Sequence, residues 1–150
     1  MSFLNSYLPY VLRQTDQTLS APFYEVLNER GVARSEWRVI SVLYELGELN
    51  VLDLAEAALS PQPTVTHAIG RLEKRGLILR TPGVADKRQR IISITPDGAE
   101  LAKTLIAEAT VLTNEALANV ENLESLVDQL QALTAAARIR LENRAIDAAS

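Results

Sequence analysis

The 150-residue sequence contains no cysteine and a single histidine. The lack of cysteine excludes disulfide bonds, thiolate metal sites, iron–sulfur clusters and redox sensing through a thiol. One histidine is too few for a multi-histidine metal centre within one chain. We therefore expect neither a metal nor a cofactor, while carboxylate sites and sites shared between chains are left open by this argument.

The sequence also lacks long hydrophobic runs, although 47% of its residues are hydrophobic. No run approaches the roughly 20 residues needed to span a bilayer, and the first residues lack the basic and apolar segments of a secretory signal. A chain of this length buries enough surface to fold as one domain without a disulfide or metal. We expect a cytoplasmic, helix-rich protein without membrane contact. No catalytic set or glycine-rich phosphate loop indicates an enzyme.

The chain has little positive charge overall, with a net charge of −4 that by itself argues against nucleic-acid binding. The charge is unevenly distributed, however. Between Gln62 and Thr95 there are seven basic and two acidic residues, a net charge of +5, which leaves −9 for the remainder. Such segregation is typical of a polyanion-binding face on an acidic body. A solvated basic surface is the alternative, and charge alone does not decide between them.

Apolar residues at intervals of three and four predict a first helical segment that ends at Gly31. Pro9 suits the first turn of a helix, whereas Pro22 is expected to kink or interrupt it. Ser35 is the expected N-cap of a second helix, which is closed by Gly47.

Two further helices and a β-hairpin are expected between residues 50 and 95. Asn50 caps a short third helix over 51–58, and Ser60 precedes a fourth helix that ends at Gly76. The next segments, 77–80 and 90–95, are short and rich in apolar or β-branched residues on either side of a turn-rich stretch, as in a β-hairpin.

The rest of the chain is expected to be helical. Thr95 and Pro96 start a long helix as cap and first residue, and a break over 119–122 separates it from a second long helix. Three helices followed by a hairpin is the order of a winged helix-turn-helix. The predicted fold is therefore mainly α with a small β-hairpin.

The fourth helix has two contrasting sides. At about 100° per residue its apolar residues cluster on one side, namely Val65, Ala68, Ile69 and Leu72. The other side has small hydrogen-bonding groups near the N-terminus and cations further along, which is the layout a DNA recognition helix needs. The alternative is an ordinary amphipathic helix with a solvent-exposed polar side, which would show the same periodicity. This alternative does not explain why acidic residues are nearly absent from the polar side. The polar side is formed by Thr66, His67, Gly70, Arg71 and Lys74, with Pro63 at the top and Thr64 on the flank.

The tip of the hairpin is the second candidate for a DNA contact. Lys87, Arg88 and Arg90 lie within four residues, and an exposed turn of this kind can enter a minor groove. Asp86 is expected to support this wing by holding a neighbouring guanidinium, because a carboxylate and an arginine can form a bidentate pair.

In these residues the chain resembles the MarR family of transcriptional regulators over nearly its whole length. The fragments that carry the resemblance are Ser35-Glu36-Trp37-Arg38-Val39, Leu54-Ala55-Glu56, Gln62-Pro63-Thr64-Val65-Thr66, Arg71-Leu72-Glu73-Lys74-Arg75-Gly76-Leu77-Ile78, Asp86-Lys87-Arg88 and Ile94-Thr95-Pro96-Asp97-Gly98. His67 is a departure, since many members have a basic residue there. Operator preference is expected to differ accordingly.

The resemblance implies a single domain over 1–150, with a winged helix-turn-helix core at 35–96. Helical segments 1–31 and 97–150 would form a homodimer, although packing of these helices within one chain is the competing account. Helix four would lie in the major groove and the wing residue Arg88 in the minor groove. The expected DNA contacts are Gln62, Thr64, Thr66, His67, Arg71, Lys74, Lys87, Arg88 and Arg90.

The function expected is a DNA-binding transcriptional regulator, a repressor acting on a pseudo-palindromic operator in double-stranded DNA. The alternative is a winged-helix module that docks an acidic protein partner without binding DNA. Many family members respond to a small aromatic or phenolic acid, and the lack of cysteine excludes the thiol-oxidation mechanism of one branch. The candidate ligand-binding residues are Tyr10, Arg13, Tyr24, Trp37 and Arg38, for which a place in the core is the competing interpretation.

Overall fold

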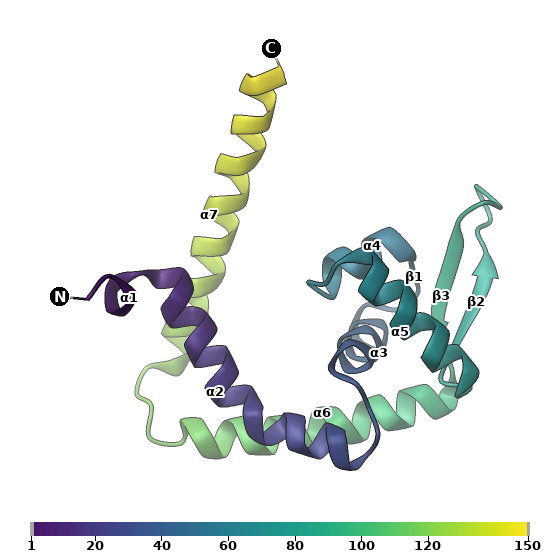
Figure 1. The fold of residues 1–150 in the computed structure, drawn as a ribbon, viewed down its shortest axis with the longest axis horizontal. Coiled ribbons are helices and arrows are strands. Elements are labelled where there is room, and N and C mark those ends of the chain that lie inside the picture. The colour runs from purple at the N-terminus through teal and green to yellow at the C-terminus, as the bar shows by residue number, and fades with distance from the viewer. Residues whose placement is uncertain (1, 150) are drawn as a thin grey trace. The chain divides into compact units, whose positions relative to one another are not determined.

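The computed structural model describes residues 2–149 and is mainly helical, with a small antiparallel sheet (Figure 1). This confirms the predicted fold class. The helices are α1 (Phe3–Ser6), α2 (Leu8–Glu29), α3 (Arg34–Leu46), α4 (Val51–Ala57), α5 (Gln62–Lys74), α6 (Pro96–Leu117) and α7 (Leu123–Ala149), and the strands are β1 (Leu49–Asn50), β2 (Ile78–Pro82) and β3 (Arg90–Ile94).

The sheet has the strand order β1-β3-β2, and both pairings are antiparallel. The predicted hairpin is confirmed, with Ile78 opposite Ile94 at its base and Pro82 opposite Arg90 near its tip. Strand β1 was not expected, because two residues are too few to show an alternating pattern. It pairs Leu49 with Ile92 and thereby attaches the hairpin to the start of α4.

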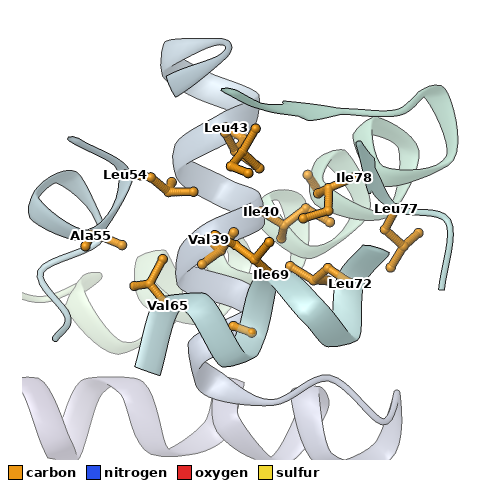
Figure 2. Packing of buried hydrophobic residues seen from close by; sticks show 14 residues of the cluster. Val39, Ile40, Leu43, Leu54, Ala55, Val65, Ile69, Leu72, Leu77 and Ile78 are labelled. Atoms are coloured by element: carbon orange, nitrogen blue, oxygen red, sulfur yellow. The ribbon is translucent and has the colours of Figure 1, made fainter. Parts of the chain in front are cut away.

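The main core lies where α3, α4 and α5 meet the sheet, as Figure 2 shows. Val39, Ile40 and Leu43 of α3 face Ile69 and Leu72 of α5, and these side chains are at most 1% exposed. Burying a side chain of this size contributes about 1.5–3 kcal/mol. The apolar side predicted for the fourth helix is thus confirmed as its buried side, which directs its polar side outward.

A second cluster joins α2 to α6 and to the start of α3. Phe23 and Leu27 of α2 are buried with Val32 and Leu105, and the Phe23 ring meets the Trp37 ring edge-on at 4.9 Å between centroids. Of the kink or interruption predicted at Pro22, the interruption does not occur, because α2 continues through this residue. Proline removes one backbone hydrogen bond, and the burial of the two side chains that follow it outweighs that loss.

The helix starts show which predicted caps form. The Asn50 side chain accepts a hydrogen bond from the Asp53 amide at 2.8 Å, and the Thr95 hydroxyl accepts one from the Gly98 amide at 3.1 Å, as expected. Ser35, however, lies inside α3, and Ala33 occupies the N-cap position. The carboxylate of Glu36 accepts the Ala33 amide at 3.0 Å, so a residue within the first turn caps this helix.

The chain divides into two compact units, residues 1–113 and 114–150. The break predicted over 119–122 is confirmed, since α6 ends at Leu117 and α7 starts at Leu123. None of the described residues of α7 is buried within the chain. Among residues 2–149, no helix combines the length and the hydropathy required to cross a membrane.

Candidate nucleic-acid interface

The outward side of α5 forms a shallow hollow of about 570 Å³, called here the α5 hollow. No acidic side chain lines it, which suits a surface that meets phosphates. Most of the predicted helix contacts come together here, whereas Thr64 is exposed beside it. The lining residues are Gln62, Pro63, Thr66, His67, Gly70, Arg71 and Lys74.

Arg71, one of the cations that line the α5 hollow, is held by two side chains of α3. The Nε of Arg71 donates to Glu36 at 2.7 Å, and its Nη2 donates to the Ser35 hydroxyl at 3.0 Å. Arg75 donates to the other carboxylate oxygen of Glu36 at 3.1 Å. Since Glu36 also accepts the Ala33 amide, one buried carboxylate fixes the start of α3, Arg71 of α5 and Arg75 at the C-cap of α5. Arg71 therefore has a positioning contact that sequence reasoning did not assign to it.

Glu36 is a positioning residue that the sequence interpretation missed. A signal was present, because Glu36 lies three, four and seven residues before Val39, Ile40 and Leu43 and so falls on the apolar stripe of its helix. A buried carboxylate needs charged or hydrogen-bonding partners. An acid on an apolar stripe therefore indicates cations on the neighbouring element, which here is α5.

The loop at the tip of the hairpin is closed by backbone hydrogen bonds. Gly83 donates to the Gln89 carbonyl at 2.9 Å, and Gln89 donates to the Asp86 carbonyl at 3.1 Å. The Asp86 carboxylate accepts the backbone amide of Arg88 at 2.9 Å. Asp86 was expected to contact a neighbouring guanidinium, but it contacts the backbone instead. The turn brings the amide of Arg88, two residues after Asp86, within reach of the carboxylate. Asp86 thus has a hydrogen-bond partner within the loop, and Lys87, Arg88 and Arg90 are exposed around it.

Both acids of the basic segment are occupied by partners in the protein. Glu73 accepts from Arg80 at 3.2 Å, which joins α5 to β2, and Asp86 accepts the Arg88 amide. Their charges are therefore partly compensated, and the cations that line the α5 hollow and the wing determine the character of this surface.

A second hollow of about 460 Å³ lies among α2, α3 and the end of α4, and is called here the α2–α3 hollow. Tyr24, Trp37 and Arg38 line it, so the structure brings together three of the five predicted ligand-binding residues. Tyr10 and Arg13 are exposed and outside the lining, since they belong to earlier turns of α2 than Asp16, where the lining begins.

The remaining lining residues were not predicted. Asp16, Ser20 and Tyr24 recur at intervals of four and therefore share one side of α2, which is a pattern visible in the sequence. The contribution of residues 57–59 was not visible, because it depends on how α4 packs against α3. Arg38 also donates to the Ser60 hydroxyl at 3.3 Å, in the connection between α4 and α5.

The chain is similar to known regulators of transcription. Residues 32–89 match the sequence model described as the MarR family. The homoprotocatechuate degradative operon repressor of Escherichia coli is 29% identical over 139 residues, which cover 91% of this chain and 93% of that protein. The regulator FarR of Neisseria gonorrhoeae is 34% identical over 90 residues, but the match spans only 60% of this chain and 62% of that protein.

A solved structure shows the same arrangement of elements. The structure of NadR in complex with 4-hydroxyphenylacetate is 27% identical, has a TM-score of 0.68, and matches over 89% of this chain and 92% of that one. The two sequence relatives named above are a repressor and a transcriptional regulator rather than enzymes, as was expected. The helix order and the winged hairpin agree with these similarities, and residues 32–89 of the chain match the MarR family.

Proposed function

We propose that the protein is a dimeric, sequence-specific repressor that acts in the cytoplasm and binds double-stranded DNA with α5 in the major groove and the wing in the minor groove. One observation carries this proposal. The α5 hollow is lined by small polar groups at the N-terminal end of the helix and by cations further along, and by no acid. Groups near the N-terminus of a recognition helix reach base edges, while cations hold phosphates.

The DNA contacts that we propose divide into three kinds. Near the N-terminus of α5, Gln62, Thr64, Thr66 and His67 read bases; Arg71 and Lys74 approach phosphates. The wing residues Lys87, Arg88 and Arg90 contact the minor groove and its backbone. Arg71 is already held by Glu36 and Ser35, and its free N–H groups are presented to DNA with little loss of side-chain entropy.

Exposed apolar side chains support assembly into a dimer. Phe3, Leu4 and Tyr7 near the N-terminus are 44–68% exposed, and Leu133 and Leu141 of α7 are 45% and 64% exposed. Helices with such surfaces require a partner. A second copy of the chain fits this requirement, because two-fold related α5 helices can read two half-sites about one helical turn apart. Light scattering should give twice the 16.5 kDa of one chain.

The DNA proposal is tested by selecting bound fragments from random duplex DNA and measuring the affinity of the selected site by fluorescence anisotropy. We expect recovery of a pseudo-palindrome whose affinity falls by orders of magnitude between about 50 and 200 mM salt. Arg88→Ala should weaken binding at least tenfold with an unchanged melting temperature, because the Arg88 side chain is exposed. If no duplex is retained, the alternative of a protein-docking module is favoured instead.

The α2–α3 hollow is the place where we propose that a small aromatic acid binds and releases DNA. Its volume lies in the range of small-molecule sites. Tyr24 and Trp37 offer aromatic surface, and Arg38 offers a cation for a carboxylate. The relative bound to 4-hydroxyphenylacetate has the same fold. Thermal shift with 4-hydroxyphenylacetate and with benzoate tests this proposal, and Arg38→Gln should abolish any stabilisation; stabilisation that survives in this variant contradicts the assignment.

A further inference from the structure

Gly70 is an unusual residue for its position in α5. It is the ninth residue of a thirteen-residue helix, well away from either end. Glycine in a helix interior lowers stability relative to alanine, because it loses more backbone freedom on folding. Its backbone is helical, since the glycines with a positive φ angle are Gly31, Gly47 and Gly76. The backbone conformation therefore gives no reason for a glycine at this position.

The packing of the chain gives no reason either. Apart from its two chain neighbours and the nearby backbone of α5 itself, no atom of residues 2–149 lies within 4 Å of a Cβ atom built on Gly70. Gly98 provides a contrast, because a Cβ atom there would lie 2.0 Å from the carbonyl oxygen of Leu77. Gly98 is thus required by contacts inside the protein, whereas the space beside Gly70 is open. If the open space beside Gly70 accommodates a contact, the contacting molecule is not part of this chain.

The open space is on the surface that we assign to DNA. Gly70 lines the α5 hollow one turn after Thr66 and His67 and one turn before Lys74. It follows the side chains that reach base edges, on the same side of the helix. Because glycine has no side chain, the helix backbone at Gly70 can come closer to a bound molecule than it could with any other residue at this position.

We propose that Gly70 is a specificity-determining residue at which the backbone of α5 makes a close approach to a base edge in the major groove. The inference rests on the proposed function. Any side chain at this position holds the helix away from the bases, and the contacts made by Thr66 and His67 lengthen. Non-specific binding depends on phosphate contacts and tolerates a larger separation from the bases.

The test compares wild-type protein with Gly70→Ala, Gly70→Ser and a control, Thr104→Ala. Thr104 is exposed on α6, and its replacement also improves helix propensity but leaves the α5 hollow unchanged. Melting temperature is measured by circular dichroism. Affinity is measured by anisotropy for the selected operator and for a scrambled duplex, each at several salt concentrations.

We expect Gly70→Ala to melt about 2–4 °C higher than wild type, because alanine is the better helix former and its Cβ atom has room. Its operator affinity should fall at least tenfold, with unchanged affinity for the scrambled duplex and an unchanged salt slope. Gly70→Ser should lose at least as much operator affinity. Thr104→Ala should bind like wild type.

The outcomes separate the inference from the function on which it rests. If wild-type protein binds no operator, the proposed function fails and the inference fails with it. If wild type binds and Gly70→Ala binds equally well, only the inference is overturned. A lower melting temperature for Gly70→Ala also overturns it, since the position would then be occupied by the protein itself.

Discussion

Replacing Glu36 should destabilise the protein through several contacts at once. Its carboxylate accepts from Arg71 at 2.7 Å, from Arg75 at 3.1 Å and from the Ala33 amide at 3.0 Å. The Glu36 side chain is 5% exposed, whereas the arginine side chains are 38–39% exposed. Water can therefore solvate the arginines once the carboxylate is gone, and no buried charge is left without a partner.

The size of the effect follows from these contacts. Two half-exposed ion pairs contribute roughly 0.5–1 kcal/mol each, and a helix cap contributes about 1 kcal/mol. For Glu36→Ala the lost burial of methylene groups adds roughly 1 kcal/mol. Burying the carboxylate has a desolvation cost in the wild-type protein, and the variant avoids this cost, which offsets part of the sum. We expect Glu36→Ala to lower the free energy of unfolding by about 3 kcal/mol. Glu36→Gln, which keeps the shape and can still accept the Ala33 amide, should lower it by about 1–2 kcal/mol.

Urea unfolding followed by circular dichroism at a fixed protein concentration measures these changes. Exposed Glu56 of α4 provides the control, and Glu56→Gln should change stability by less than about 0.5 kcal/mol. Replacing Arg71 or Arg75 alone leaves Glu36 one arginine, whereas replacing both leaves a buried carboxylate with only the Ala33 amide. The double replacement should therefore cost more than the sum of the single ones. Strict additivity, or a Glu36→Ala variant as stable as wild type, would refute the reasoning.

Three further outcomes are expected. Asp86→Ala should weaken operator binding severalfold although it removes an acid from a basic surface, because the Arg88 amide loses its acceptor. Asp86→Asn can still accept that amide and should bind at least as well as wild type. An anisotropy titration in which Asp86→Ala binds more tightly than Asp86→Asn contradicts this role. Gly98→Ala should lower the melting temperature by more than 10 °C, since its Cβ atom would meet a backbone oxygen at 2.0 Å. Glu108→Gln, which breaks the exposed pair with Arg30, should cost less than about 1 kcal/mol in urea unfolding.

The local pattern of the sequence determined most of the elements and the outward side of α5. Val65, Ile69 and Leu72 recur at helical spacing, and such periodicity depends only on neighbours along the chain. The caps at Asn50 and Thr95 are also local, since each hydroxyl or amide oxygen accepts an amide three residues away. Charge segregation then indicated which surface meets a polyanion.

Only the tertiary structure decided the contacts between distant segments. Glu36 and Arg71 are 35 residues apart in the chain, and their pairing depends on how α3 packs against α5. For the same reason Tyr24 and Arg38 reach one hollow while Tyr10 does not. The continuity of α2 through Pro22 was likewise decided by burial against other helices. A periodic pattern specifies which side of a helix is apolar, but the partner on the other side of the core is fixed by packing across the whole fold.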